Sequence, residues 1–62
     1  MQDEAPFLTV QDIAERLQVS EQTVRRWIKT GQLPAIELGG QYRVSPDDFR
    51  EFLKKHRKRL PD

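Results

Sequence analysis

The sequence predicts a mainly α domain with three short helices and a two-stranded β-hairpin between the second and the third helix. Apolar residues recur at helical spacing in three stretches and alternate with a period of two in another stretch. Capping residues, glycines and prolines mark the boundaries between these stretches. With 62 residues the chain has room for one domain, so we expect a single domain over residues 1–62.

The first helix is expected over about residues 10–17. Thr9 and Asp12 have the spacing of a capping box, although Asp is shorter than the usual Glu or Gln. Ahead of this cap, Phe7 or Leu8 can fold back on the helix as a hydrophobic staple. The cap and the apolar period together predict where this helix begins.

The second helix is expected over about residues 21–30. Ser20 is a favourable N-cap, and Gly31 can adopt the left-handed conformation that ends a helix. Only about three residues separate the first two helices, so we expect a helix-turn-helix in which Val19 of the turn packs inward. The expected core face of this helix consists of Val24, Trp27 and Ile28.

Alternating apolar residues predict a hairpin over about residues 35–44. We argue its register from these residues, which should share one face. A two-residue loop, Gly39-Gly40, places Ile36 opposite Arg43 and breaks that face. A three-residue loop that also includes Gln41 keeps the face intact, and we expect this register. Its cross-strand pairs are Leu38 with Tyr42 and Ile36 with Val44.

The third helix is expected over about residues 46–57. Ser45 is its N-cap, Pro46 takes the first helical position, and acidic residues follow in the first turn. The basic residues over positions 54–59 complement the negative end of the helix dipole or bind phosphate, and the sequence leaves both open. The expected apolar face carries Phe49, Phe52, Leu53 and His56.

Composition argues against several kinds of site. The chain has no cysteine and one histidine, so we expect neither a disulfide framework nor a metal site. It contains no nucleophile–base set and no phosphate-cradling loop, so we expect no enzyme activity and no cofactor. Asp47 and Asp48 are explained by their position at a helix start. Without a long apolar run or a signal peptide, a cytoplasmic protein with no membrane contact is expected.

Charge is unevenly distributed, although the formal net charge is only +1. Residues 1–24 hold five acidic residues and one arginine, whereas residues 25–62 hold ten Lys and Arg against five acidic residues. Such asymmetry indicates an anionic partner for the second part of the chain. A helical domain with ordinary mixed surface charge explains the asymmetry about as well.

Long polar side chains cover the face of the second helix that points away from its expected core. At roughly 100° per residue, Gln22, Arg26 and Lys29 point away from the core, and Thr23 and Arg25 flank them. Side chains of this kind reach base edges and phosphates in a DNA major groove. The alternative is the solvated polar face that every surface helix needs.

The glycine-rich tip of the hairpin adds a second polar element beside this helix. A small tip can approach a DNA backbone closely, and Arg43 can contact a phosphate or serve only to keep the strand edge soluble. At the helix start, Ser20 and the free backbone N–H groups can also take a phosphate. The candidate DNA-binding residues are Ser20, Gln22, Thr23, Arg25, Arg26, Lys29, Gly40, Gln41 and Arg43.

Four runs in the chain, in this order, resemble the excisionase-type, MerR-like winged helix-turn-helix family. The runs are LTVQDIA at 8–14, VSEQTVRRWI at 19–28, GQLPA at 31–35 and YRV at 42–44. The resemblance implies sequence-specific binding of duplex DNA, with the second helix in the major groove and the hairpin, as a wing, on the backbone or the adjacent minor groove. By position, it places the polar residues of the second helix on the recognition surface and makes Arg43 the wing arginine.

Members of this family include phage and mobile-element excision factors, small transcription regulators and DNA-binding domains of larger recombinases or regulators. The resemblance therefore implies a nucleoid-associated architectural factor in DNA recombination or a small regulator of transcription. Members that stand alone often bind direct repeats head to tail and bend DNA, and the charge asymmetry suits such self-association. The chain lacks the long dimerisation helix and effector domain of MerR regulators, so a domain of a longer protein is also expected.

A protein-interaction module that docks a recombinase or polymerase subunit is the alternative from another class. Such a module needs an exposed apolar patch. Few apolar side chains remain for one once Trp27, Phe49 and Phe52 are buried, and this favours the DNA-binding interpretation.

Overall fold

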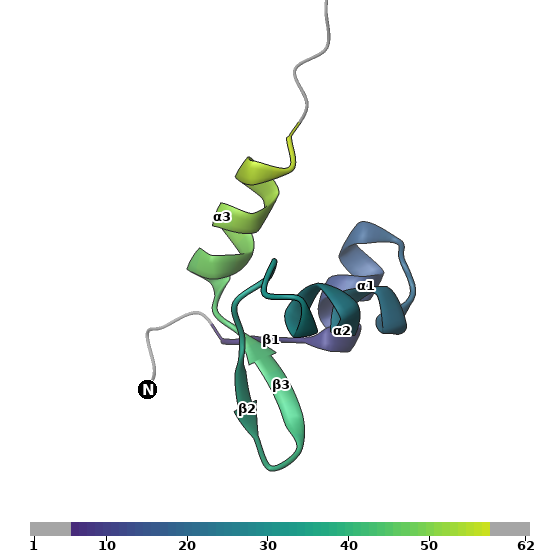
Figure 1. The fold of residues 1–62 in the computed structure, drawn as a ribbon, viewed down its shortest axis with the longest axis vertical. Coiled ribbons are helices and arrows are strands. Elements are labelled where there is room, and N and C mark those ends of the chain that lie inside the picture. Colours follow the sequence, from purple (N-terminus) through teal and green to yellow (C-terminus); the bar gives the residue numbers. More distant parts are fainter. Residues whose placement is uncertain (1–5, 58–62) are drawn as a thin grey trace, which may run out of the picture.

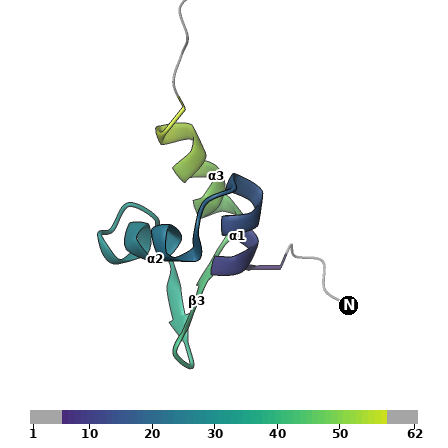
Figure 2. The same ribbon diagram turned by 90° about the vertical axis from the view of Figure 1, so that its right-hand side faces the viewer.

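A computed structural model of the chain describes residues 6–57. Within that range three helices and a three-stranded antiparallel sheet form the fold, and the β2–β3 hairpin projects from the helices on the side opposite to α3 (Figures 1 and 2). The predicted fold class, mainly α with a hairpin wing, is confirmed. The elements are β1 (Leu8–Thr9), α1 (Val10–Leu17), α2 (Glu21–Lys29), β2 (Ile36–Leu38), β3 (Gln41–Val44) and α3 (Pro46–Lys55).

A capping box begins α1. The hydroxyl of Thr9 accepts a hydrogen bond from the Asp12 N–H at 3.0 Å, and the Thr9 N–H donates to Asp12 Oδ2 at 3.0 Å. The short Asp side chain therefore completes the box. Leu8, which precedes the cap, is buried in the same core as Ile13, whereas Phe7 is 47% exposed. Leu8 is thus the residue that packs ahead of the helix.

The turn between α1 and α2 uses a left-handed residue other than glycine. Gln18 has φ 58° and ψ 47°, and its N–H donates to the Ala14 carbonyl. The Val19 N–H donates to the same carbonyl at 3.0 Å. Val19 also packs against the core, as predicted. The hydroxyl of Ser20 then caps α2 by accepting from the Thr23 N–H at 3.1 Å.

The end of α2 has the predicted glycine cap. The helix ends at Lys29, one position before the expected end, and Thr30 is its C-cap. The Thr30 N–H donates to the Arg26 carbonyl at 2.9 Å, and Gly31 follows with φ 83°. A left-handed glycine here turns the chain out of the helix and toward β2.

The third helix begins at the predicted residue and ends earlier than expected. Ser45 accepts a hydrogen bond from the Asp48 N–H at 3.0 Å, which is its predicted N-cap role. The helix ends at Lys55, with His56 as C-cap. In the predicted basic end, residues 58 and 59 lie outside the described part of the chain.

The register of the hairpin differs from the one predicted. The loop contains two residues, Gly39 and Gly40, with φ 59° and 82°. Positive φ at both central positions is the backbone that a type I′ turn requires, and this turn matches the twist of the flanking strands. The three-residue loop was wrong because turn geometry, rather than a shared apolar face, sets the pairing. The observed pairs are Ile36 with Arg43, Glu37 with Tyr42 and Leu38 with Gln41.

This register divides the apolar residues of the hairpin between two faces. Directly opposed residues of an antiparallel pair point to the same side of the sheet. Ile36 and Leu38 therefore share a face with Arg43 and Gln41, and their side chains are 46% and 57% exposed. Val44 lies on the other face and is fully buried in the core.

A third strand, β1, joins the sheet and was not predicted. Leu8 pairs with Val44 and Thr9 pairs with Arg43, which makes β3 the central strand in the order β1-β3-β2. Two residues are too few to show an alternating pattern in the sequence. The strand attaches the start of α1 to the base of the wing.

The helices and β3 enclose one small core. Leu33, between α2 and β2, is fully buried although it was not predicted as a core residue. Trp27, predicted as core, is only partly buried, and its ring centroid lies 4.9 Å from that of Phe52 on α3. Leu53, predicted on the apolar face of α3, is 39% exposed. The buried residues are Leu8, Val10, Ile13, Ala14, Val24, Leu33, Val44, Phe49 and Phe52.

Candidate nucleic-acid interface

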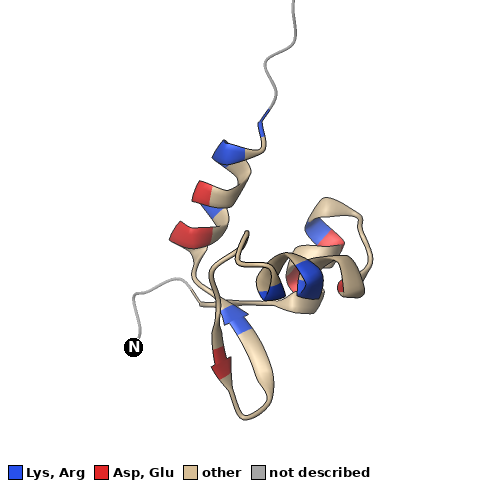
Figure 3. Ribbon diagram, viewed as in Figure 1, with Lys and Arg blue, Asp and Glu red and all other residues tan. Residues whose placement is uncertain are grey.

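One face of α2 is polar and turned away from the core. Val24 is fully buried, and the neighbouring apolar residues of the helix pack partly against the core. The opposite face exposes Gln22 and Arg26, with Arg25 and Lys29 toward the wing. Figure 3 shows Lys and Arg positions in blue along α2 and on β3. The two elements thus present positive charge to the same region.

A groove of about 460 Å³ lies between α2, the start of α1 and the wing. Its lining includes candidate residues from both α2 and the wing. The candidates that line it are Arg25, Lys29, Gly40, Gln41 and Arg43. Four other candidates lie on α2 or at its start and do not line it: Ser20, Gln22, Thr23 and Arg26.

Arg43 is held in place within the wing. Its Nη1 donates to the Tyr42 carbonyl at 3.0 Å, and its Nη2 donates to Gln41 Oε1 at 3.1 Å. The residue is partly buried and lies opposite Thr9 of β1. A guanidinium has further N–H donors beyond these two, and they remain available for an anionic ligand.

The cations of α2 that line the groove are weakly held. Arg25 Nη2 lies 3.1 Å from Glu21 Oε1 one turn away, and the two side chains are 49% and 45% exposed. An exposed pair at this spacing contributes only about 0.3–0.5 kcal/mol. Lys29 forms no ion pair within residues 6–57. Both cations can therefore turn toward an anion at little cost.

Two acidic residues, Glu21 and Glu37, also line this groove. Glu37 lies opposite Tyr42, on the face of the wing away from Arg43. Sequence reasoning missed this position because a local strand pattern does not show which wing residues come near α2. A carboxylate among the cations lowers the attraction of the groove for an anion.

Ser20 and Thr23 interact with each other at the start of α2. In addition to the capping bond, the two hydroxyl oxygens lie 3.0 Å apart. A hydroxyl both donates and accepts, so each residue keeps capacity for a further partner. Glu21 in the first turn already complements the positive end of the helix. A phosphate bound here would face that carboxylate.

The capping box also controls the charge beside Arg43. The Thr9 backbone N–H, followed by the Thr9 hydroxyl, holds the pKa of Asp12 below its ordinary value of 3.8, and Arg16 and Arg43 add weaker attraction. Asp12 is therefore a stable carboxylate close to the base of the wing.

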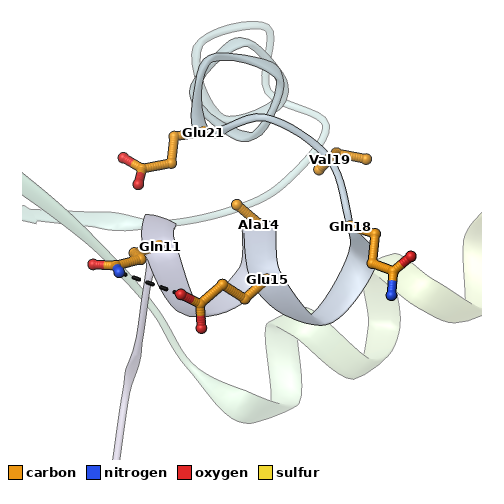
Figure 4. A pocket seen from close by; sticks show the side chains of 6 residues that line it. All are labelled: Gln11, Ala14, Glu15, Gln18, Val19 and Glu21. Carbon is orange, nitrogen blue, oxygen red and sulfur yellow. Dashed lines mark hydrogen bonds between the residues drawn. The ribbon is translucent and has the colours of Figure 1, made fainter.

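A second, shallow hollow of about 410 Å³ lies at the turn between α1 and α2 (Figure 4). Gln11 Nε2 donates to Glu15 Oε2 at 3.3 Å, and these two residues project on the same side as Glu21. The lining residues include two carboxylates and no cation, so this hollow is unsuited to an anion. They are Gln11, Ala14, Glu15, Gln18, Val19 and Glu21.

No metal centre or membrane segment emerges from the described residues. Between residues 6 and 57, no three His, Asp or Glu side chains gather as metal ligands. In the same range, no helix combines the length and apolar character needed to cross a bilayer. The groove beside α2 is lined by five of the nine candidate residues.

Two helices joined by a tight turn, followed by a wing beside the second helix, define a winged helix-turn-helix domain. The sequence pattern of the helix-turn-helix domain family matches residues 7–57, a range that includes every observed helix and strand. The chain therefore belongs to the helix-turn-helix domain family.

Several curated proteins are similar to this chain. The protein named "Putative DNA-binding protein Rv0500A" of Mycobacterium tuberculosis is 34% identical over 53 residues, which are 86% of this chain and 68% of that protein. Rv2310 of the same organism is 40% identical over 55 residues, 89% of this chain and 48% of Rv2310. YvgK of Bacillus subtilis is 36% identical over 59 residues, 95% of this chain and 19% of YvgK. The chain thus spans about half of Rv2310 and about a fifth of YvgK. No solved structure matches the chain significantly.

Proposed function

We propose that the chain binds duplex DNA with sequence preference, with α2 in the major groove and the wing on the adjacent backbone or minor groove. The observation that carries this proposal is the groove in which Arg25 and Lys29 of α2 lie beside Gln41 and Arg43 of the wing. A surface that joins a helix and a hairpin in this way fits one duplex at two places. Membership in the helix-turn-helix family and the printed name of the Rv0500A relative support the same function.

The candidate residues divide into two roles. Gln22 and Arg26, on the exposed face of α2, have the chemistry to read base edges, because a carboxamide pairs with adenine and a guanidinium with guanine. The residues nearer the wing or at the helix start contact phosphates and set the position of the protein. Gly40 has a positive φ of 82°, which the turn requires. A side chain added there would meet no atom within 4 Å, so the need for glycine comes from the backbone conformation and not from packing. The phosphate group comprises Ser20, Thr23, Arg25, Lys29, Gln41 and Arg43.

The biological role we propose is that of an excisionase-like architectural factor or a small transcription regulator of the MerR-like type, nucleoid-associated in the cytoplasm. The chain spans only part of some relatives. The alternative within this proposal is therefore that the domain is the DNA-binding part of a larger recombinase or regulator. Head-to-tail self-association on DNA is supported by complementary charge. The acidic hollow at the α1–α2 turn and the basic last turn of α3 have opposite signs.

A specific observation favours a second candidate function, the docking of a protein partner such as a recombinase or polymerase subunit. An apolar groove of about 420 Å³ lies between the N-terminal segment, α1 and α3, and includes Leu8, Phe49 and the 39%-exposed Leu53. The sequence predicted few exposed apolar side chains once Trp27, Phe49 and Phe52 were buried, and of these three Trp27 is only partly buried. Within residues 6–57 the exposed large apolar residues are Phe7, Ile36, Leu38 and Leu53.

A fluorescence-anisotropy titration tests DNA binding. Sites are first selected from a random duplex pool, and labelled selected and random duplexes are then titrated at several salt concentrations. We expect tighter binding to the selected duplex and an affinity that falls as salt rises, because phosphate contacts release counterions. Weak binding that is equal for both duplexes contradicts the proposal and favours the docking function.

A further inference from the structure

The outer face of the wing combines polar and apolar side chains. Gln41 and Arg43 lie on it, and the register places Leu38 directly opposite Gln41 and Ile36 directly opposite Arg43. Leu38 is 57% exposed, the largest exposed fraction among the large apolar residues of the described chain. It directly precedes the two glycines of the turn and therefore lies at the tip of the wing.

The protein core does not account for these two apolar residues. Neither Ile36 nor Leu38 is buried in the core or packed against it. Both lie on β2, an edge strand of the three-stranded sheet, where exposed apolar residues promote aggregation. Figures 1 and 2 both show this hairpin projecting away from the helices, so its tip is free to reach a partner.

We propose that Leu38, with Ile36 behind it, enters the minor groove of the bound duplex and contacts deoxyribose and base edges. This inference rests on the proposed function and assigns the contact made by the wing tip. Apolar side chains at the tips of DNA-binding elements commonly enter the minor groove. Gln41 and Arg43, on the same face, hold the tip by the flanking phosphates. Guanine places an amino group in this groove, so Leu38 favours steps that lack it.

A second copy of the chain is the competing occupant of this face. Two aliphatic side chains provide far less than the roughly 1,200 Å² that a specific protein interface buries. Arg43 beside them also matches an anionic surface better than an identical wing, which would bring two arginines together. The small apolar area and the positive charge of the face therefore favour DNA.

The test compares Leu38→Ser with Leu53→Ser, a matched substitution of an exposed leucine on α3. On the selected duplex, Leu38→Ser is expected to weaken binding about five- to tenfold, because serine removes the apolar surface that leucine buries against the DNA. The salt dependence of binding is expected to stay as in the wild type, because leucine contacts no phosphate. Leu53→Ser is expected to bind like the wild type. Circular dichroism of each variant verifies that it is folded.

A second arm locates the contact in the minor groove. Replacing G·C by inosine·C pairs in the duplex removes the minor-groove amino group and leaves the major groove pattern intact. The wild type is expected to bind the inosine duplex more tightly than the parent duplex, and Leu38→Ser is expected to lose most of that difference.

The outcomes separate the inference from the function on which it rests. If the wild type shows no preference for the selected duplex, the proposed function fails and this inference fails with it. If the wild type binds selectively and Leu38→Ser binds equally well, the function stands and the inference is overturned. Sedimentation of the free protein tests whether a second copy of the chain occupies this face. Self-association that Leu38→Ser abolishes also overturns the inference.

Discussion

Ile36 lies directly opposite Arg43 in the hairpin, on the face of the wing turned away from the core. Thr9 of β1 is the partner of the same arginine on its other side, so Arg43 occupies the middle of the sheet. One register therefore decides where the wing arginine points, which residues accompany it and which face the core.

Residues on α2 and in the wing are expected to respond differently to substitution. Arg26→Ala or Gln22→Ala should weaken binding to the selected duplex by about 1–3 kcal/mol and relax sequence preference, because these side chains read base edges. Arg43→Ala should weaken binding to all duplexes similarly and reduce the salt slope by about one. Anisotropy titrations on selected and random duplexes measure both effects. Equal losses on the two duplexes for the α2 variants would contradict their base-reading role.

Removing the negative charge of Glu37 is expected to strengthen DNA binding. The carboxylate lines the groove with Arg25 and Lys29 and repels a phosphate bound there. We expect Glu37→Gln to raise affinity roughly two- to tenfold at low salt and less at high salt, because salt screens the repulsion. Glu51→Gln is the control, since Glu51 pairs with Lys54 at 3.7 Å on α3, away from the groove. Unchanged or weaker binding by Glu37→Gln would place this carboxylate outside the DNA contact.

The turn of the wing is expected to tolerate asparagine at its first position and resist alanine at its second. Gly39 and Gly40 both have positive φ, and no atom lies within 4 Å of a side chain added to either. The cost of substitution is therefore conformational, about 1–2 kcal/mol for Gly40→Ala. Gly39→Asn creates the Asn-Gly pair that favours this turn and should leave the free energy of unfolding nearly unchanged. Urea unfolding monitored by Trp27 fluorescence measures both, and equal loss in the two variants would contradict the turn type.

The capping box is expected to make stability depend on acid. The folded-state pKa of Asp12 is lowered, so the unfolded chain binds this proton more readily than the folded one. The stabilisation is fully present above the ordinary value of 3.8 and is lost as pH falls from there through the lower folded value. Unfolding curves recorded from about pH 5 to about pH 2 should show a shallower loss of stability for Asp12→Asn than for the wild type. An equally steep loss in both would show that this carboxylate is not responsible.

The sequence by itself determined where the three helices begin. Each helix begins with a hydroxyl that accepts a hydrogen bond from the backbone N–H three residues later in the chain, and these hydroxyls belong to Thr9, Ser20 and Ser45. Gly31 turns the chain out of α2. These contacts join residues close in the chain, so short sequence patterns predict them. The polar face of α2 follows from the same local periodicity.

The tertiary structure decided the contacts between distant segments. It joined β1 to β3, buried Leu33 between the elements, left Trp27 partly exposed against Phe52, and placed Glu37 beside α2. Each of these features depends on how segments far apart in the chain pack together. In the hairpin, the geometry of the two-glycine turn set the register, although the apolar pattern of the strands had predicted another one. The groove and the apolar tip of the wing therefore arise from pairing and packing, whereas the helices that carry them are encoded locally.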